Sequence, residues 1–276
     1  MKDRIRLVMA DLDGTLLTSE QKVDARTIRA IDTLRKQGIL FGLCTGREGK
    51  SVMNSLAAWG IEGRVDVLVS GGGGVIEDLQ LKTKEQFGAL PARTILEIMK
   101  HHEDQKVNFV IPDEGILYTT VDDELIQMVS RVDHVPYQTV SLEDFLKTSR
   151  MKMMLVCDEK DMPEVQKRGA EFQSDEIRLK PLVTASVLFE YMDPSISKSA
   201  ALQRVLDLHG WSADNLLVFG DQDNDADMLK FAGTGVCMAN GSELSRKAAD
   251  FITADNDHEG VALFLEEHVL QEEQES

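Results

Sequence analysis

The sequence predicts an α/β fold with a parallel-sheet core and an inserted α+β module. At both ends of the chain, short apolar runs alternate with segments of helical periodicity, the pattern of parallel strands joined by helices. The middle, from about Lys82 to Met192, is more polar, and its expected strands arrive in pairs. The length of 276 residues is enough for one large or two medium domains.

The first half of the expected core contains three apolar strands with helices between them. The strands are predicted at residues 5–10, 39–44 and 65–70. The first helix begins after Asp24, which is placed as an N-cap, and ends at Gly38. A second helix is predicted over roughly 48–59.

The second half of the core repeats this alternation late in the chain. Helices are predicted at about 197–209, 223–232 and 242–249, and strands at 215–220, 235–239 and 250–253. These apolar strands have polar neighbours only at their ends. We therefore expect a parallel sheet that helices cover on both faces.

The middle segment differs in pattern. Strands are predicted at 107–111, 115–120 and 151–157, and helices at about 91–102, 122–132 and 160–172. This α+β pattern interrupts the α/β one, so the core domain is expected to be discontinuous. The predicted domains are residues 1–81 with 193–276 for the core, and 82–192 for the insert.

Composition argues against several classes of partner. The net charge is −18, with 48 acidic and 30 basic residues, which disfavours nucleic acids and anionic membranes as partners. No stretch is long enough to span a membrane, and the N-terminus lacks a signal-peptide core. We expect a cytoplasmic protein. The three cysteines are far apart and do not form a zinc motif.

Polar or glycine residues follow each of four predicted core strands, and a lysine lies before the fourth. They are Asp11 and Asp13, Thr45-Gly46-Arg47, the glycine run 71–74, the segment Asp221–Asp225, and Lys198 before the fourth strand. In open α/β sheets, sites form where the carboxyl ends of the strands meet. The glycine run lacks the ending of a P-loop, so it does not predict a nucleotide site.

This set of residue types favours phosphoryl transfer. The carboxylates of Asp11 and Asp221 are hard oxygen ligands that suit Mg²⁺. Thr45, the amide of Gly46 and Lys198 can surround a phosphate. Asp13 lies two residues after Asp11, so on an extended chain both can reach the same phosphorus. The pair Asp13-Gly14 alone would indicate an ordinary turn. Asp223 is interpreted as a loop carboxylate and Asp227 as a helix-surface carboxylate.

Four motifs make the chain resemble the haloacid dehalogenase superfamily, and within it the Cof-type phosphatases. The superfamily's DxDGT, TGR, lone lysine and GDxxND motifs correspond, in the same order, to DLDGT (11–15), TGR (45–47), Lys198 and GDQDND (220–225). The resemblance implies a Rossmann-like core domain with an inserted cap domain. It covers about 1–80 and 195–270 by motif, and the middle by position and length.

The resemblance also implies roles for individual residues. Asp11 would attack phosphorus and form an aspartyl-phosphate, and Asp13 would act as general acid and then as general base. Asp11, the backbone carbonyl of Asp13, and Asp221 would hold Mg²⁺, with Asp225 supporting the metal. The residues expected at the phosphate or substrate are Thr45, Gly46, Arg47, Lys198, Asn224 and Asn240.

Two segments depart from the group's usual pattern. Ser70-Gly71-Gly72 stands where Asn-Gly-Ala is common, and Ala239-Asn240-Gly241 replaces Gly-Asn-Ala. The first loses a side-chain amide that could contact substrate, and the second moves a glycine. The nearby Asp255-Asn-Asp257 is interpreted as the N-cap region of a following helix.

The resulting expectation is a Mg²⁺-dependent phosphomonoester hydrolase acting on a small phosphorylated metabolite, with sugar phosphates as the family-wide substrate class. One alternative is a phosphotransferase or phosphomutase with the same aspartyl-phosphate. Another is a phosphate-sensing regulatory protein in which an aspartate is phosphorylated. The second carboxylate, Asp13, favours turnover over signalling.

Overall fold

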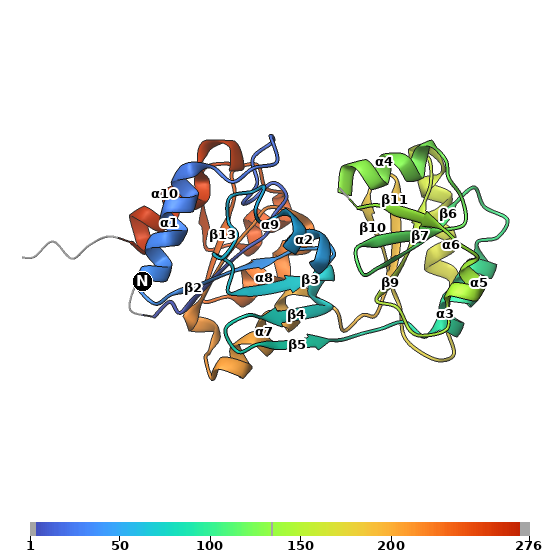
Figure 1. Ribbon diagram of the computed structural model, residues 1–276, viewed down its shortest axis with the longest axis horizontal. Helices are drawn as coiled ribbons and strands as arrows, with labels where there is room; N and C mark the ends of the chain where they lie inside the picture. Colours follow the sequence, from blue (N-terminus) through green and yellow to red (C-terminus); the bar gives the residue numbers. More distant parts are fainter. Residues whose placement is uncertain (1–3, 134, 271–276) are drawn as a thin grey trace, which may run out of the picture. The chain divides into compact units, whose positions relative to one another are not determined.

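The computed structural model describes residues 4–133 and 135–270, which form two compact units. One unit combines the described residues up to Glu85 with those from Ser197 onward, and the other comprises Gln86–Ile196 (Figure 1). The first unit therefore comes from both ends of the chain. Among the described helices, none has the length and apolarity needed to cross a membrane.

The first unit is built on an eight-stranded sheet with the order β14-β13-β12-β1-β2-β3-β4-β5. The strands are β1 (Leu7–Ala10), β2 (Leu40–Cys44), β3 (Val67–Ser70), β4 (Val75–Asp78), β5 (Thr83–Gln86), β12 (Leu216–Gly220), β13 (Thr234–Cys237) and β14 (Phe251–Ile252). From β14 to β3 all neighbours are parallel, which confirms the predicted sheet. The chain reverses after β3, so β4 runs antiparallel to it.

Helices cover both faces of this sheet. Its helices are α1 (Ala25–Lys36), α2 (Gly49–Ser55), α7 (Lys198–His209), α8 (Ala226–Phe231), α9 (Glu243–Ala248) and α10 (Gly260–His268). Side chains of α1, α2 and α10 share one buried cluster with Val8 of β1, whereas α7 and α8 share another with Met9. The alternation along β1 thus feeds two apolar layers, as expected for a sheet buried on both sides.

Short 3₁₀ turns connect several elements. They are η1 (Gly71–Gly73), η2 (Glu159–Asp161), η3 (Ala213–Asn215), η4 (Asp223–Asp225) and η5 (Asn256–His258). The predicted helix over 223–232 is therefore a 3₁₀ turn followed by α8. The prediction for 255–257 is also confirmed, because the Asp255 side chain caps η5 by accepting a hydrogen bond from the Asp257 backbone N–H.

The second unit has a six-stranded sheet with the order β10-β11-β9-β6-β7-β8. Its elements are α3 (Ala92–His101), β6 (Asn108–Asp113), β7 (Ile116–Thr119), α4 (Glu124–Asp133), β8 (Tyr137–Thr139), α5 (Leu142–Phe145), β9 (Lys152–Val156), α6 (Met162–Glu171), β10 (Lys180–Ala185) and β11 (Leu188–Met192). The predicted pairing of β6 with β7 is confirmed as an antiparallel ladder. The sequence did not predict β8, β10 or β11.

Candidate active site

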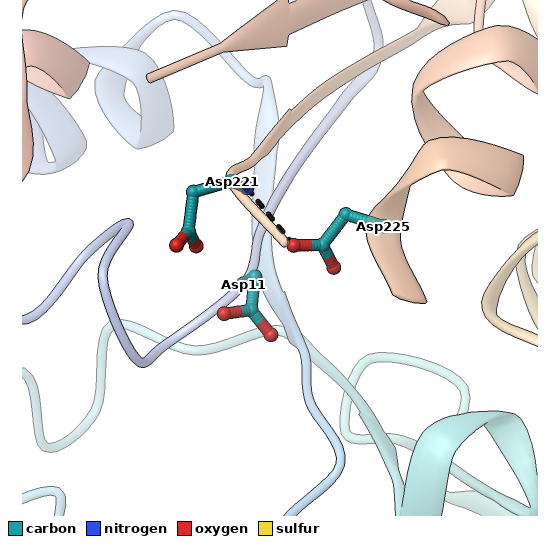
Figure 2. Close-up of side chains that lie close together, drawn as sticks. All are labelled: Asp11, Asp221 and Asp225. Carbon is teal, nitrogen blue, oxygen red and sulfur yellow. Dashed lines mark hydrogen bonds between the residues drawn. The ribbon is translucent and has the colours of Figure 1, made fainter. Parts of the chain in front are cut away.

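The candidate site lies where the predicted core strands end. Asp11 directly follows β1, Thr45 follows β2, and Asp221 follows β12. The Asp11 backbone N–H still donates to the Phe219 carbonyl, at 3.0 Å, so the β1–β12 ladder holds the base of this side chain. Figure 2 shows the carboxylates of Asp11, Asp221 and Asp225 gathered at this edge.

Lys198 supplies the buried positive charge of the cluster. It is the first residue of α7, and its side chain is only 2% exposed. Its Nζ donates to Asp11 Oδ1 at 2.6 Å and also to Asp225 Oδ1. Burial alone would lower the pKa of Lys198, but the two carboxylates outweigh burial and raise it. The ammonium group therefore stays charged beside the predicted nucleophile.

Hydrogen bonds orient the two carboxylates that follow β12. Asp221 Oδ1 accepts from the Thr15 hydroxyl at 2.7 Å, and its Oδ2 accepts from the Gln222 side-chain amide at 2.9 Å. Asp225 Oδ2 accepts from the backbone N–H groups of Asp221 and Gln222, both at 2.9 Å (Figure 2 draws the first). Asp225 thus closes the loop after β12 as well as pairing with Lys198.

The donor set fits a hard divalent cation. One oxygen from each of Asp11, Asp221 and Asp225 lies within 4.8 Å of the others, and all three residues are buried. Burial raises the pKa of Asp11, and the Asp225 and Asp221 carboxylates add to this effect, so that the pKa reaches about 8 against the opposing effect of Lys198. The cluster contains three carboxylates and one ammonium group, and oxygen-only ligands are what Mg²⁺ prefers.

Asp13, two residues after Asp11, is more exposed than the three clustered carboxylates. Its side chain is 48% exposed. Its Oδ2 accepts from Nε of Arg47 at 2.8 Å, and Oδ1 accepts from a second guanidinium nitrogen, so the pair is bidentate. The same guanidinium donates to Gln21 Oε1 at 3.0 Å and lies 5.7 Å from the Trp59 ring centre. Arg47, expected at the substrate, is here a partner of Asp13.

The remaining expected phosphate residues differ in their surroundings. Thr45 is buried, and its hydroxyl accepts from the Arg47 backbone N–H at 3.1 Å. Gly46 is exposed, with open space where a side chain would begin. Asn224 is exposed in η4. Thr45 and Gly46 are therefore at the end of β2, next to Arg47, whereas Asn224 is on the loop after β12.

The glycine run after β3 supports the turn at Thr45–Arg47. The Gly71 N–H donates to the Arg47 carbonyl at 2.8 Å, and the Gly72 N–H donates to the Thr45 carbonyl at 3.0 Å. Both glycines have positive φ, of 59° and 69°, which an L side chain rarely adopts. The run therefore shapes a neighbouring loop through its backbone.

Three site residues had no role in the sequence analysis. Thr15 and Gln222 orient Asp221, and Gln21 contacts Arg47. Thr15 and Gln222 stand inside the quoted DLDGT and GDQDND motifs, so their position was a usable signal. Gln21 stands in no motif, and only the structure connects it to Arg47.

The family follows from comparison with known proteins. Residues 8–265 match the model of the haloacid dehalogenase-like hydrolases, so the chain belongs to this family and the predicted resemblance is confirmed. A haloacid dehalogenase-like hydrolase from Bacteroides thetaiotaomicron has the same fold, with a TM-score of 0.87 and 23% identity over 95% of this chain and 99% of that one. The predicted α/β class is thereby confirmed.

Relatives of similar sequence carry phosphatase names. The chain is 25% identical, over 97% of its length and 99% of the relative's, to the 5-amino-6-(5-phospho-D-ribitylamino)uracil phosphatase YitU of Bacillus subtilis. It is 24% identical, over 96% and 99%, to the pyridoxal phosphate phosphatase YbhA of Escherichia coli. These names agree with the predicted class of enzyme, a phosphatase of this family.

Proposed function

We propose that this protein is a Mg²⁺-dependent phosphomonoester hydrolase that forms an aspartyl-phosphate on Asp11. The observation that carries the proposal is the contact between Lys198 and Asp11 inside a buried cluster of three carboxylates. This arrangement keeps the Lys198 ammonium group beside the Asp11 carboxylate, which would attack a negatively charged phosphate. The two phosphatase relatives support the same reaction.

Substrate binding would use groups that face the end of the sheet. Lys198, Thr45 and the Gly46 amide would contact the phosphate, and Asn224 would approach from the loop after β12. Asp11, the Asp13 carbonyl and Asp221 would hold Mg²⁺, which supplies charge neutralisation between the attacking carboxylate and the phosphate. Asp225 would keep Lys198 and the β12 loop in place.

The reaction would then proceed in two displacements. The Asp11 carboxylate forms a bond to phosphorus as the ester P–O bond breaks, and the departing oxygen takes its proton from Asp13. The Asp13 carboxylate next removes a proton from water, and the water oxygen attacks phosphorus. The bond between phosphorus and Asp11 breaks, which restores the Asp11 carboxylate and releases phosphate.

The substrate is proposed to be a small phosphorylated metabolite, with a sugar or polyol phosphate as the first candidate. The name of one relative contains a phosphoribityl group, which supports this choice, whereas the other relative is named for pyridoxal phosphate. The two names describe different leaving groups at nearly equal identity to this chain. Measurement of released phosphate across both classes, with Mg²⁺ and with a chelator, distinguishes them.

The experiment that tests the two-aspartate mechanism compares leaving groups. Asp13→Asn should reduce turnover of an alkyl phosphate by on the order of 10²–10⁴-fold, because an alkoxide needs a proton as it leaves. A nitrophenyl phosphate leaves as a stable phenolate, so the first step should persist and give a burst of about one nitrophenolate per active site. Acid quenching should then recover a peptide phosphorylated at Asp11.

Asp11→Asn is the control and should show neither the burst nor the adduct. Equal losses of activity on both substrates in Asp13→Asn, without a burst, would contradict the acid–base role. A burst followed by transfer of the phosphoryl group to an added alcohol, with no transfer to water, would favour the alternative of a phosphotransferase.

A further inference from the structure

Three polar residues near the C-terminus bind the loop that carries Asp13. This group, which we call the C-terminal tether, consists of Asn240, Asn256 and Asp257. The proposed mechanism gives the three side chains no role. The resemblance had placed one of them, Asn240, near the substrate.

The first two contacts are made to backbone carbonyls. Asn240 Nδ2 donates to the Gly14 carbonyl at 2.8 Å, across 226 positions of the chain. Asn256 Nδ2 donates to the Leu17 carbonyl at 2.9 Å, across 239 positions. Each contact therefore holds the backbone of the loop without using a side chain of the loop.

The third contact secures the next part of the same loop. Asp257 Oδ1 accepts from the Ser19 backbone N–H at 2.7 Å, and its Oδ2 accepts from the Ser19 hydroxyl at 2.6 Å. Together the tether holds three points between Gly14 and Ser19. A single carboxylate that accepts both a backbone and a hydroxyl hydrogen bond gives this point a defined geometry.

The tether is itself ordered by local contacts. The Asn256 backbone N–H donates to Asn240 Oδ1 at 3.4 Å, which links the two amides. Asp255 caps η5 and accepts from the Asp257 backbone N–H at 3.0 Å. The Gly260 backbone N–H donates to the Asp255 carbonyl at 3.2 Å. The tether therefore offers a fixed surface to the loop.

The loop leaves little freedom at the point where Asn240 binds. Gly14 has φ +79°, and a Cβ there would lie 2.5 Å from Asp221 Oδ2. Its neighbour Thr15 donates to Asp221 at 2.7 Å. The Gly14 peptide thus connects Asp13 to a predicted metal ligand, and a shift of this peptide would move Asp13.

We propose that the C-terminal tether is a positioning device that holds the loop from Gly14 to Ser19 and thereby places Asp13 for proton transfer. Asn240, Asn256 and Asp257 are positioning residues in this proposal, since they contact the loop and not the reacting groups. The inference rests on the proposed function, because it takes Asp13 as the acid–base group.

The test uses isosteric changes that reverse one hydrogen bond. Asn240→Asp and Asn256→Asp each replace an N–H donor by an oxygen that faces a carbonyl. Asn215→Asp is the matched control, because Asn215 Nδ2 donates to the Arg4 carbonyl at 2.7 Å, before the start of β12 and so at the other end of that strand from Asp221. Asp257→Ala, at an exposed position, removes the third contact without adding a repulsion.

We expect the three tether variants to lower kcat for an alkyl phosphate by on the order of 10–10²-fold, the effect of a small misplacement of a catalytic group. KM and the rate of nitrophenolate release in a single turnover should change far less, because phosphate binding and the departure of a stable phenolate do not need a proton from Asp13. Hydrogen exchange should accelerate in the peptide that contains the loop. Asn215→Asp should change neither the ratio of the alkyl phosphate rate to the nitrophenyl phosphate rate nor hydrogen exchange in the loop.

The possible failures can be told apart. The ratio that decides is alkyl phosphate turnover divided by the single-turnover rate of nitrophenolate release. If Asp13→Asn lowers this ratio but the tether variants do not, the tether is overturned and the proposed function stands. If the tether variants slow alkyl phosphate turnover and single-turnover nitrophenolate release equally, their effect is not on proton transfer by Asp13, and the tether is again overturned. If Asp13→Asn leaves the ratio unchanged, the acid–base assignment fails, and the catalytic purpose of the tether fails with it.

Discussion

At the scale of single residues, the charged side chains of the site form two separate groups of ion pairs. Lys198 is buried between Asp11 and Asp225, so removing its ammonium group would leave two buried carboxylates without their cation, at a cost of about 3–5 kcal/mol. Asp13 is instead paired with Arg47 in a partly exposed position. The two aspartates of one motif thus have different environments, as the two roles proposed for them would require.

The acidic residues after β12 give a test of the metal assignment. Asp221 is buried at 1% exposure, whereas Asp223 is exposed in η4. Asp221→Ala should abolish most turnover. It should also raise the Mg²⁺ concentration for half-maximal activity by at least about 10–100-fold, the loss typical for residues that contact a metal ligand and not the metal itself. Asp223→Ala should have a mild effect.

Titration of activity with Mg²⁺ in both variants checks this prediction. Circular dichroism and thermal unfolding would confirm that both variants are folded. Similar increases in the Mg²⁺ requirement for the two substitutions would mean that the loop after β12 presents its carboxylates differently from the assignment made here.

At the scale of elements, the loop between β1 and α1 depends on one glycine for close approach. Gly14 and Gly38 both have positive φ, at 79° and 77°. A Cβ at Gly14 would collide with Asp221, whereas a Cβ at Gly38 would have nothing within 4 Å. Substitution at Gly38 would therefore show the effect of the backbone conformation alone, whereas substitution at Gly14 would add a steric clash.

Alanine at each position tests that separation. Gly14→Ala and Gly38→Ala should each lose about 1–2 kcal/mol of stability, because both place an L side chain in a left-handed conformation. Only Gly14→Ala should also lose most of its phosphatase activity. Thermal unfolding and turnover measured on the same preparations are sufficient. Full activity of Gly14→Ala would show that the Asp221 carboxylate can move without consequence.

At the scale of the whole molecule, each unit has its own apolar core. The clusters that contain Val8 and Met9 draw only on residues of the first unit. Those that contain Leu155 and Val156 draw only on Gln86–Ile196. All the residues proposed for chemistry belong to the first unit, so the second is free for another purpose, which we propose is substrate selection as a cap.

Replacing Gln86–Ile196 by a short linker tests this division. The remaining protein should still hydrolyse nitrophenyl phosphate, because the carboxylate cluster and Lys198 are retained. Discrimination among sugar phosphates should fall sharply, since the groups proposed to contact the leaving group are removed. A panel of kcat/KM values before and after the replacement measures the effect. Unchanged discrimination would place specificity in the first unit.

Several features of the molecule were predictable because they depend on neighbouring residues. The N-cap of α1 is an example, since the Asp24 side chain accepts hydrogen bonds from the Thr27 backbone N–H and hydroxyl, three residues away. The apolar strands are another, because burial on both faces requires continuous apolar runs. Once parallel strands were predicted, the meeting of Asp11, Thr45 and Asp221 at one edge followed from the direction of the strands.

Other elements lacked a local signal. β5 has the sequence TKEQ, and β10 is mostly exposed, so neither shows an apolar pattern. Both are edge strands of their sheets, where partly exposed residues are tolerated. Their existence depends on the neighbouring strand, and a periodicity within the segment itself does not reveal it.

By itself, the sequence determined the fold class, the family and the set of residues at the ends of the strands, because these depend on local pattern and on motif order. Only the tertiary structure decided that Arg47 pairs with Asp13 and that Asn240, Asn256 and Asp257 hold the loop from Gly14 to Ser19. Those tether contacts join residues separated by 226 to 239 positions. The physical reason is that a hydrogen bond requires an approach of about 3 Å, and for such distant residues only the completed packing of the sheet and helices brings the two groups together.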